Sequence, residues 1–173
     1  VSFAQEEKID LTIVGPEAPL SQGIVDLFEA HFLPIIGPDQ RGALLESSKI
    51  FAKNFMKKYQ IPTSSFETFD DYEEAVDYLK KRDVYPLVIK ADGLAGGKGV
   101  YIAYDVDEAI DALGELMVDL KFGSAGERVV IEDFLEGEEA TVMVLWDGKS
   151  YFLLPSSQDH KRVGEGDIGP NTG

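Results

Sequence analysis

A glycine-rich segment, VIKADGLAGGKGV at residues 88–100, constrains this chain more than any other feature. Its four glycines and two lysines are Gly93, Gly96, Gly97, Gly99, Lys90 and Lys98. Glycine lets a backbone approach a phosphate closely and turn successive N–H groups toward it, and lysine adds positive charge. The segment therefore predicts a loop that binds a polyphosphate.

The spacing within the segment excludes two common phosphate-binding motifs. A P-loop needs Ser or Thr after its lysine and then a helix, whereas Lys98 is followed by Gly99 and a β-rich run at 100–103. The dinucleotide fingerprint needs Gly-x-Gly-x-x-Gly at the start of a helix, and that spacing is absent. We predict a flap between two antiparallel strands, 87–90 and 100–103. An ordinary flexible hairpin is the alternative.

Two apolar runs and a helical pattern precede this segment. The runs at 11–14 and 33–36 each end at a Gly-Pro pair and are typical of buried strands. Between them apolar residues recur at helical spacing, at Leu20, Ile24, Leu27, Phe28 and Phe32. Strand, helix and strand in this order predict a βαβ unit with a parallel sheet, so this part is α/β.

An α+β pattern follows. We expect a helix over 47–59, with Ser47 or Ser48 as its N-cap, and Asp70 and Asp105 as the N-caps of two later helices. The elements predicted after that first helix are strand 64–69, helix 71–81, the two strands flanking the glycine loop, helix 106–120, strand 129–132, and a hairpin of 140–146 with 151–154. We place domain boundaries near Pro62 and Ala125.

The composition narrows the class of protein. Hydrophobic residues make up 44% of the 173, which is typical of a globular chain. No apolar run approaches the ~18 residues that span a bilayer, and cysteine is absent, which excludes disulfides and thiolate metal sites. We expect a cytoplasmic monomer. The net charge of −16 argues against nucleic-acid binding but not against a nucleotide, which needs only a few lysines and N–H groups.

Several segments together resemble one family. Residues 85–100 are similar to the glycine-rich loop of ATP-grasp enzymes, and more closely to that of the phosphoribosylamine–glycine ligases. Matching segments are IDLTIVGPEAPL (9–20), SKIFAKNFM (48–56), VIEDFLEGEEA (130–140) and QDHKRVGEGDIGPNTG (158–173). The resemblance implies the end of a parallel-sheet N-terminal domain over 1–46, a linker helix over 47–62, an ATP-grasp lid over 63–125, and the beginning of a central domain over 126–173.

The resemblance also implies an ATP site. Lys49 and Lys90 would reach the phosphates beneath the loop, whereas Lys53, one helical turn after Lys49, is expected to be a solvated neighbour. Of Glu138 and Glu139, the second is favoured for the ribose hydroxyls. The complete implied set, which includes a hinge against the adenine, is Lys49, Lys90, Gly93, Gly96, Gly97, Lys98, Gly99, Glu132, Phe134, Leu135 and Glu139.

A substrate site is implied by the polar cluster near the end of the chain. Its residues are Asp159, His160 and Lys161, with Asn171 and Thr172 in the adjoining loop. Glu17 follows the first strand at its carboxyl end, where parallel sheets place ligands. It would contact the amine substrate, or only stabilise the start of a helix. His31, near the end of the first helix, is expected to be structural or exposed.

The family's reaction joins glycine to 5-phosphoribosylamine, with ATP becoming ADP and phosphate, in purine biosynthesis. The resemblance places the Mg²⁺ or Mn²⁺ ligands of the family beyond Gly173, so it implies no metal ligand within the chain, and it points to no catalytic residue. The chain stops inside a loop-like run at 165–173. We therefore expect a piece of a longer protein that does not catalyse the reaction alone. The alternatives are another ATP-grasp carboxylate–amine ligase and a non-catalytic nucleotide-binding module.

Overall fold

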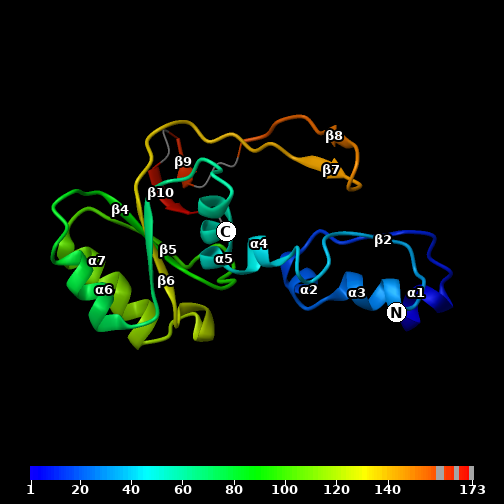
Figure 1. Cartoon of the computed structure of the whole chain (residues 1–173), viewed down its shortest axis with the longest axis horizontal. Helices are drawn as coiled ribbons and strands as arrows, with labels where there is room; N and C mark the ends of the chain where they lie inside the picture. Colours follow the sequence, from blue (N-terminus) through cyan, green and yellow to red (C-terminus); the bar gives the residue numbers. More distant parts are fainter. Residues whose placement is uncertain (159–161, 166–167, 172–173) are drawn as a thin grey trace. The chain divides into compact units, whose positions relative to one another are not determined.

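The computed structural model describes residues 1–158, 162–165 and 168–171. The chain divides into two units, Val1–Phe134 and Leu135–Gly173 (Figure 1). The first unit holds all the helices of the described residues and a four-stranded sheet, and the second holds short antiparallel strand pairs.

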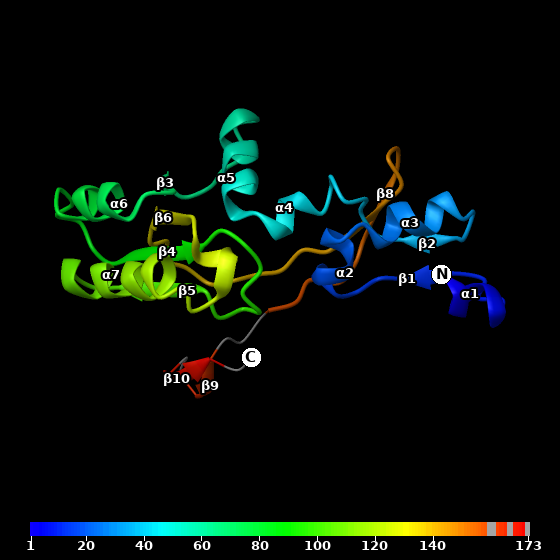
Figure 2. The same ribbon diagram turned by 90° about the horizontal axis from the view of Figure 1, so that it is seen from below.

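The first unit opens with a small α/β arrangement. Its elements are α1 (Ser2–Glu6), β1 (Thr12–Ile13), α2 (Glu17–Ser21), α3 (Ile24–Ala30) and β2 (Ile35–Ile36). Strands β1 and β2 pair in parallel, which confirms the βαβ prediction. Figure 2 shows the two strands side by side, with α3 next to β2.

The helix between these strands differs from the prediction. It is broken into α2 and α3 at Gly23, whose φ of 81° is left-handed. Glycine adopts this conformation without the steric cost that a side chain would add. Phe32, which we had expected on the apolar helix face, lies beyond α3 and is 95% exposed. The helix α1 was not predicted, because five residues carry too little periodicity to reveal it.

The first unit also contains two short helical connections. They are α4 (Leu44–Ser47), which leads into α5 (Lys49–Lys58), and the 3₁₀ turn Gly123–Gly126, which precedes the last strand of the sheet.

The sheet of the first unit consists of β3 (Phe66–Phe69), β4 (Leu87–Ala91), β5 (Val100–Ala103) and β6 (Val129–Asp133). Its order among the described residues is β3-β6-β4-β5, and each neighbouring pair is antiparallel. The glycine-rich segment therefore connects two antiparallel neighbours, β4 and β5, as predicted.

The alternation of side chains along each strand gives the sheet two different faces. Leu87, Ile89 and Ala91 are fully buried in a core with α6 (Tyr72–Leu79) and α7 (Val106–Leu113). The intervening side chains, including Lys90, belong to the opposite face. Figure 1 shows α6 and α7 on one side of the sheet and α5 on the other. The polar face of the sheet is thus the face toward α5.

Side-chain caps fix the starts of the three longest helices. Ser48 accepts a hydrogen bond from the Phe51 N–H and caps α5, which resolves the choice between Ser47 and Ser48. Asp105 caps α7 as predicted. The cap of α6 is Asp71 and not Asp70, because the Asp71 carboxylate accepts from the Glu74 N–H.

The helix expected over 106–120 remains α-helical only to Leu113. It continues as a wider π turn over Gly114–Val118. The sequence pattern identified the helical stretch but not this change in its winding.

The strand β6 lies inside the sheet rather than after it. It pairs with β3 on one side and with β4 on the other. We had placed a boundary near Ala125 and assigned residues from 126 onward to a following domain. The structure instead keeps Val129–Asp133 with the lid strands and divides the chain after Phe134. A strand distant in sequence can complete a sheet, and local patterns do not reveal its partners.

The described residues of the second unit form two antiparallel strand pairs. The first is β7 (Val144–Trp146) with β8 (Tyr151–Leu153), which confirms the predicted hairpin, although both strands are shorter than predicted. The second is β9 (Arg162–Gly164) with β10 (Ile168–Asn171).

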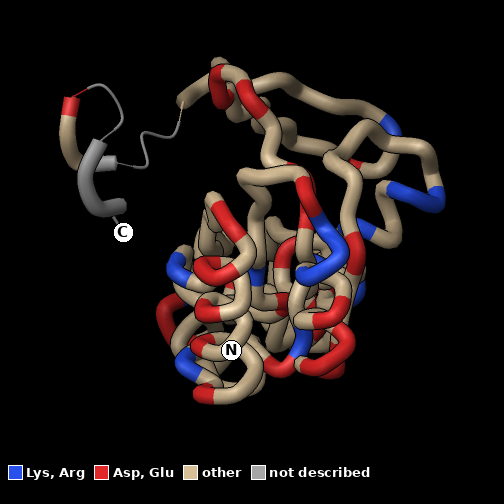
Figure 3. Tube along the Cα trace, turned by 90° about the vertical axis from the view of Figure 1, so that its left-hand side faces the viewer, with Lys and Arg blue, Asp and Glu red and all other residues tan. Residues whose placement is uncertain are grey.

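Acidic residues are spread over the first unit rather than gathered in one region (Figure 3). Within the described part of the chain, no helix has the length and apolar content required to cross a membrane.

Candidate functional site

The first turn of α5 is tied to the start of the glycine loop. Asp92 comes directly after β4, and its backbone carbonyl accepts a hydrogen bond from the Lys49 N–H at 3.0 Å. One carboxylate oxygen accepts from the Ile50 N–H and the Ser48 hydroxyl, both at 2.8 Å. Lys49 Nζ donates to the Gly93 carbonyl at 3.1 Å. The predicted phosphate lysine is therefore held beside the loop by three separate groups.

Asp92 also contacts Arg128, the residue before β6. Its second carboxylate oxygen accepts from Arg128 Nη2 at 2.5 Å, and its N–H donates to the Arg128 carbonyl at 2.9 Å. The residue is only 4% exposed, so its charge depends on these partners. Our sequence analysis did not single out Asp92. The sequence signal for Asp92 was its position, directly after a buried strand and directly before the first glycine of the loop.

The environment of Lys49 disfavours a bare ammonium. Burial lowers the pKa of Lys49, and the nearby charge of Lys90 lowers it further, whereas Glu46 and Asp92 act in the opposite direction. An anion placed between Lys49 and Lys90 would relieve both unfavourable effects. This electrostatic pattern fits a phosphate site.

Glu132 is the charged centre of the sheet face toward α5. It is buried, and its two carboxylate oxygens pair with different lysines: Oε1 with Lys90 and Oε2 with Lys53. Lys90 and Glu132 lie on the same face, because β4 and β6 pair with Val88 opposite Glu132 and Lys90 opposite Val130. Our expectation of a solvated Lys53 is wrong, because this residue is 8% exposed.

The spacing within α5 explains the position of Lys53. It lies three residues after Ile50 and three before Met56, so it shares their helical stripe. This stripe faces the sheet, where the carboxylate of Glu132 satisfies the ammonium. The apolar neighbours were the sequence signal that we missed.

Two opposing effects act on the pKa of Glu132. Burial raises it, but hydrogen bonds from Lys53 and Lys90, the charge of Lys90, and a hydrogen bond from Ser64 outweigh burial. The net result is a pKa below the ordinary value for a glutamate. Glu132 is therefore a buried, ionised carboxylate at neutral pH.

The four loop glycines have two different structural roles. Gly96 and Gly97 have φ values of 57° and 76° and open space around them. Among the described residues, no acceptor is hydrogen-bonded to either N–H. A side chain at Gly93 would instead meet Ala125 at 2.9 Å, and one at Gly99 would meet Ala95 at 2.7 Å. The first two glycines present free N–H groups, and the other two permit close packing.

The remaining residues of the predicted nucleotide set are exposed. Lys98 is exposed within the loop, and its N–H donates to the Ala95 carbonyl at 3.1 Å. Phe134 is 37% exposed at the end of the first unit, and Leu135 is 69% exposed at the start of the second. Glu139 is exposed in the second unit. The structure thus brings Lys49, Lys90, Glu132 and the glycine loop together within the first unit.

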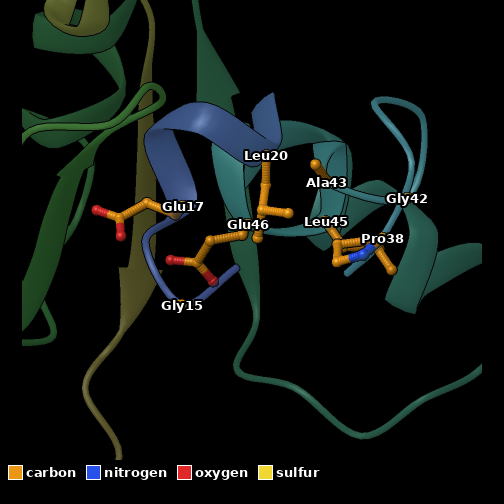
Figure 4. A pocket seen from close by; sticks show the side chains of 8 residues that line it. All are labelled: Gly15, Glu17, Leu20, Pro38, Gly42, Ala43, Leu45 and Glu46. Atoms are coloured by element: carbon orange, nitrogen blue, oxygen red, sulfur yellow. The ribbon is translucent and has the colours of Figure 1, made fainter. Parts of the chain in front are cut away.

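A separate pocket lies in the N-terminal part of the first unit. It has a volume of about 550 Å³, and its lining residues are Gly15, Glu17, Leu20, Pro38, Gly42, Ala43, Leu45 and Glu46. Figure 4 shows the carboxylates of Glu17 and Glu46 on the same side of it. Glu17 is also the first residue of α2, so both of its predicted roles remain open. Glu46 was not identified from the sequence.

The predicted polar substrate cluster cannot be placed in full. Asp159, His160, Lys161 and Thr172 lie outside the described residues, and Asn171 is the last residue of β10. His31 is confirmed as an exposed residue at a helix end, where Nδ1 is 2.8 Å from the Leu27 carbonyl. Within residues 1–158, 162–165 and 168–171, no three His, Cys, Asp or Glu side chains converge to hold a metal ion.

Comparisons with known proteins identify the family. Residues 47–173 match the family model described as phosphoribosylglycinamide synthetase, ATP-grasp (A) domain, and residues 1–46 match the N domain of the same synthetase. The phosphoribosylamine–glycine ligase of Salmonella typhimurium is 54% identical over all 173 residues. The chain spans about 40% of the length of that relative.

Solved structures agree with this match. The phosphoribosylamine–glycine ligase of Thermotoga maritima superimposes with a TM-score of 0.71 and 42% identity, over 80% of this chain and 35% of that one. A D-alanine–D-alanine ligase from Helicobacter pylori gives a TM-score of 0.67 at 20% identity, over 88% of this chain and 48% of that one. The second likeness concerns the fold alone. The predicted fold class and the resemblance on which it rested are both confirmed.

Proposed function

This chain belongs to the phosphoribosylglycinamide synthetase family, and from that premise we propose that it binds ATP for the joining of glycine to 5-phosphoribosylamine. One observation carries the proposal: Asp92 fixes Lys49 beside the glycine loop, close to Lys90. Two cations from different elements, together with free backbone N–H groups, are the groups that a polyphosphate requires.

Each part of the nucleotide would then have its own contacts. Lys49 and Lys90 bind phosphate oxygens, and the N–H groups of Gly96 and Gly97 cover them. Gly93 and Gly99 keep the loop packed closely enough to do so, and Lys98 adds positive charge within the loop. Glu132, Phe134, Leu135 and Glu139 are proposed for the adenosine part, with the backbone near Phe134 and Leu135 for the adenine edge.

The chemistry proposed is a two-step acyl transfer. A carboxylate oxygen of glycine attacks the γ-phosphorus, the bond to ADP breaks, and an acyl phosphate forms. The amine of phosphoribosylamine then attacks the acyl carbon, phosphate leaves, and the amine loses a proton to give glycinamide ribonucleotide. The groups of this chain contribute positioning and charge neutralisation, which supply most of the rate in phosphoryl transfer. Closure of the lid, residues 63–125, which carries the glycine loop, would exclude water from the acyl phosphate.

Other residues are proposed for the amine substrate and the phosphoribosyl group. Glu17 is proposed for the amine substrate, because its carboxylate lines a pocket and can accept a hydrogen bond from an amine N–H. Asp159, His160, Lys161, Asn171 and Thr172 are proposed for the phosphoribosyl group. A bound Mg²⁺ or Mn²⁺ would neutralise charge on the transferring phosphate. The described residues offer no cluster that fits such an ion.

The setting of the reaction is also a proposal. We propose a cytoplasmic protein that acts as a monomer on small-molecule substrates and does not bind nucleic acid. The net charge of −16 supports the last point, because nucleic-acid binding depends on basic surfaces.

A substrate panel tests the proposed reaction. The longer protein that carries this chain is incubated with ATP and either glycine plus phosphoribosylamine, D-alanine, or bicarbonate, and ADP formation is measured. We expect ADP only with the first pair, together with glycinamide ribonucleotide detected by mass spectrometry. ADP formation with D-alanine or bicarbonate but not with the first pair would overturn the proposal. The 173-residue chain alone is expected to form no product.

A further inference from the structure

Lys53 is a buried cation that the proposed nucleotide contacts do not use. Its Nζ donates to Thr63 Oγ1 and to Ser64 Oγ, both at 2.8 Å, and pairs with Glu132 Oε2. A lysine ammonium has three N–H donors, and three acceptors are present. Lys53 therefore has no donor left for a ligand, and a role in binding must act through its partners.

Ser64 strengthens the connection between Lys53 and Glu132. The Ser64 hydroxyl accepts from Lys53 Nζ and donates to Glu132 Oε2 at 2.8 Å. The same carboxylate oxygen is thus held directly by Lys53 and indirectly through Ser64. This side of Glu132 is fixed by residues that lie before β3 and within α5.

Lys90 pairs with the other carboxylate oxygen of Glu132, but it is more exposed than Lys53 and has donors to spare. It pairs with Oε1, and the Lys90 side chain is 29% exposed, compared with 11% for Lys53. Within the described residues, Glu132 is the one side-chain partner of the Lys90 ammonium, so two of its three donors remain available. Of the two lysines, Lys90 is the one that can turn to a new anion.

Transfer of Lys90 to a phosphate would create an electrostatic problem. A buried carboxylate that loses its counter-ion is strongly disfavoured and takes up a proton. Protonation would remove the charge that orders Ser64 and the start of β3. A second counter-ion that does not leave would prevent this.

We propose that Lys53 is a positioning residue that keeps Glu132 ionised and fixed in place while Lys90 moves from Glu132 to a nucleotide phosphate. The inference rests on the proposed function, because it takes the phosphate as the new partner of Lys90. It adds different roles for the two lysines. Lys90 binds the ligand, and Lys53 keeps Glu132 ionised and in place.

The other charged groups near Glu132 do not act as a permanent counter-ion for its carboxylate. Lys57, one turn after Lys53, is exposed, and both lysines lie over the Phe66 ring, at 5.6 and 5.5 Å. Asp133 belongs to the opposite face of the sheet and pairs with Arg82 at 2.5 Å. Lys57 is therefore a matched control, since it shares the helix, the charge and the aromatic contact of Lys53 but not the carboxylate.

The first test removes the two lysines in turn and needs no nucleotide. The ionisation of Glu132 is followed by the ¹³C shift of its carboxyl group. In Lys90→Met, which mimics the departure of Lys90, we expect Glu132 to remain ionised at neutral pH. In Lys90→Met/Lys53→Met its pKa should rise by at least about two units. Protonation of Glu132 at neutral pH in Lys90→Met alone, or an ionised Glu132 in the double variant, would overturn the inference.

The second test uses ADP as the ligand. Calorimetric titrations in buffers of different ionisation enthalpy measure proton uptake on binding, and the unmodified protein provides the reference for the titration of ADP itself. We expect Lys53→Met to take up as much as about one additional proton, so that its affinity falls by up to about tenfold per pH unit as pH rises. Lys53→Arg should restore the reference value, and Lys57→Met should match it.

The outcomes separate the inference from the proposed function. ADP binding with equal proton uptake in the unmodified protein and in Lys53→Met would overturn the inference and leave the proposed function standing. Absence of ADP binding by the unmodified protein would overturn both, whatever the carboxyl titration shows.

Discussion

The carboxylate of Asp92 accepts a hydrogen bond from the backbone N–H of Ile50 at 2.8 Å. Through this contact the first turn of α5, which carries Lys49, is fixed to the residue that begins the glycine loop. Helix and loop are separated by more than forty residues in sequence, so Asp92 is the link between two parts of one site.

Replacement of Asp92 should loosen this link. Asp92→Ala would leave the Ile50 N–H and the Ser48 hydroxyl without their acceptor, and we expect the free energy of unfolding to fall by about 2–4 kcal/mol. Urea denaturation measures the change. Asp119→Ala, at an exposed aspartate, is the control and should change stability by less than about 0.5 kcal/mol. An equal effect of the two changes would show that Asp92 has no special structural role.

Glu132 should make stability depend on pH on the acidic side. Its pKa is lowered in the folded chain, so its contribution is present above the unfolded-state value of about 4.3 and is lost as pH falls through the folded value. Glu132→Gln leaves Lys53 buried without a counter-ion, and we expect a loss of about 3–5 kcal/mol at pH 7.

Denaturant titrations of Glu132→Gln and the unmodified chain at pH 7 and at progressively lower pH measure this difference. The difference in the free energy of unfolding between the unmodified chain and Glu132→Gln should become smaller as pH falls. A gap that is constant with pH would contradict the assignment of Glu132 as an ionised group.

A glycine in tight surroundings and a glycine in open surroundings should respond differently to replacement by alanine. In Gly126→Ala the new Cβ would lie 2.4 Å from the Leu116 carbonyl oxygen, so the backbone must move, and we expect a loss of about 2 kcal/mol or more. In Gly96→Ala the surroundings are open, and only the left-handed φ of 57° opposes the change, at about 1 kcal/mol. Thermal and urea unfolding of both variants give the comparison. A larger loss in Gly96→Ala would contradict the open geometry of the loop.

Much of the fold followed from local patterns. The antiparallel strands around the glycine loop and the parallel pair β1 and β2 were predicted from apolar runs and turn residues, because these signals lie within a few residues of each element. The position of β6 inside the sheet was not, since pairing between distant strands leaves no local signal.

The candidate site was predicted unevenly for a similar reason. Lys90 and the loop glycines could be identified from the sequence, because a lysine ends an apolar strand and four glycines follow it within ten residues. Lys53 was misjudged and Asp92 was missed, because the importance of each comes from partners about 80 and 44 residues away in sequence, Glu132 and Ser48. A buried ion pair is a property of tertiary structure, and only an apolar helical stripe hinted at it.

ADP binding by Lys90→Met tests the nucleotide site most directly. Loss of one charged hydrogen-bond donor to phosphate should weaken binding by about 10- to 100-fold. The Lys121→Met variant is the control, because Lys121 carries the same charge and pairs with Glu115 at 2.5 Å, yet lies outside the proposed site. An equilibrium titration should give the unmodified dissociation constant for Lys121→Met and a much larger one for Lys90→Met. Equal constants for the two variants would contradict a phosphate site at Lys90.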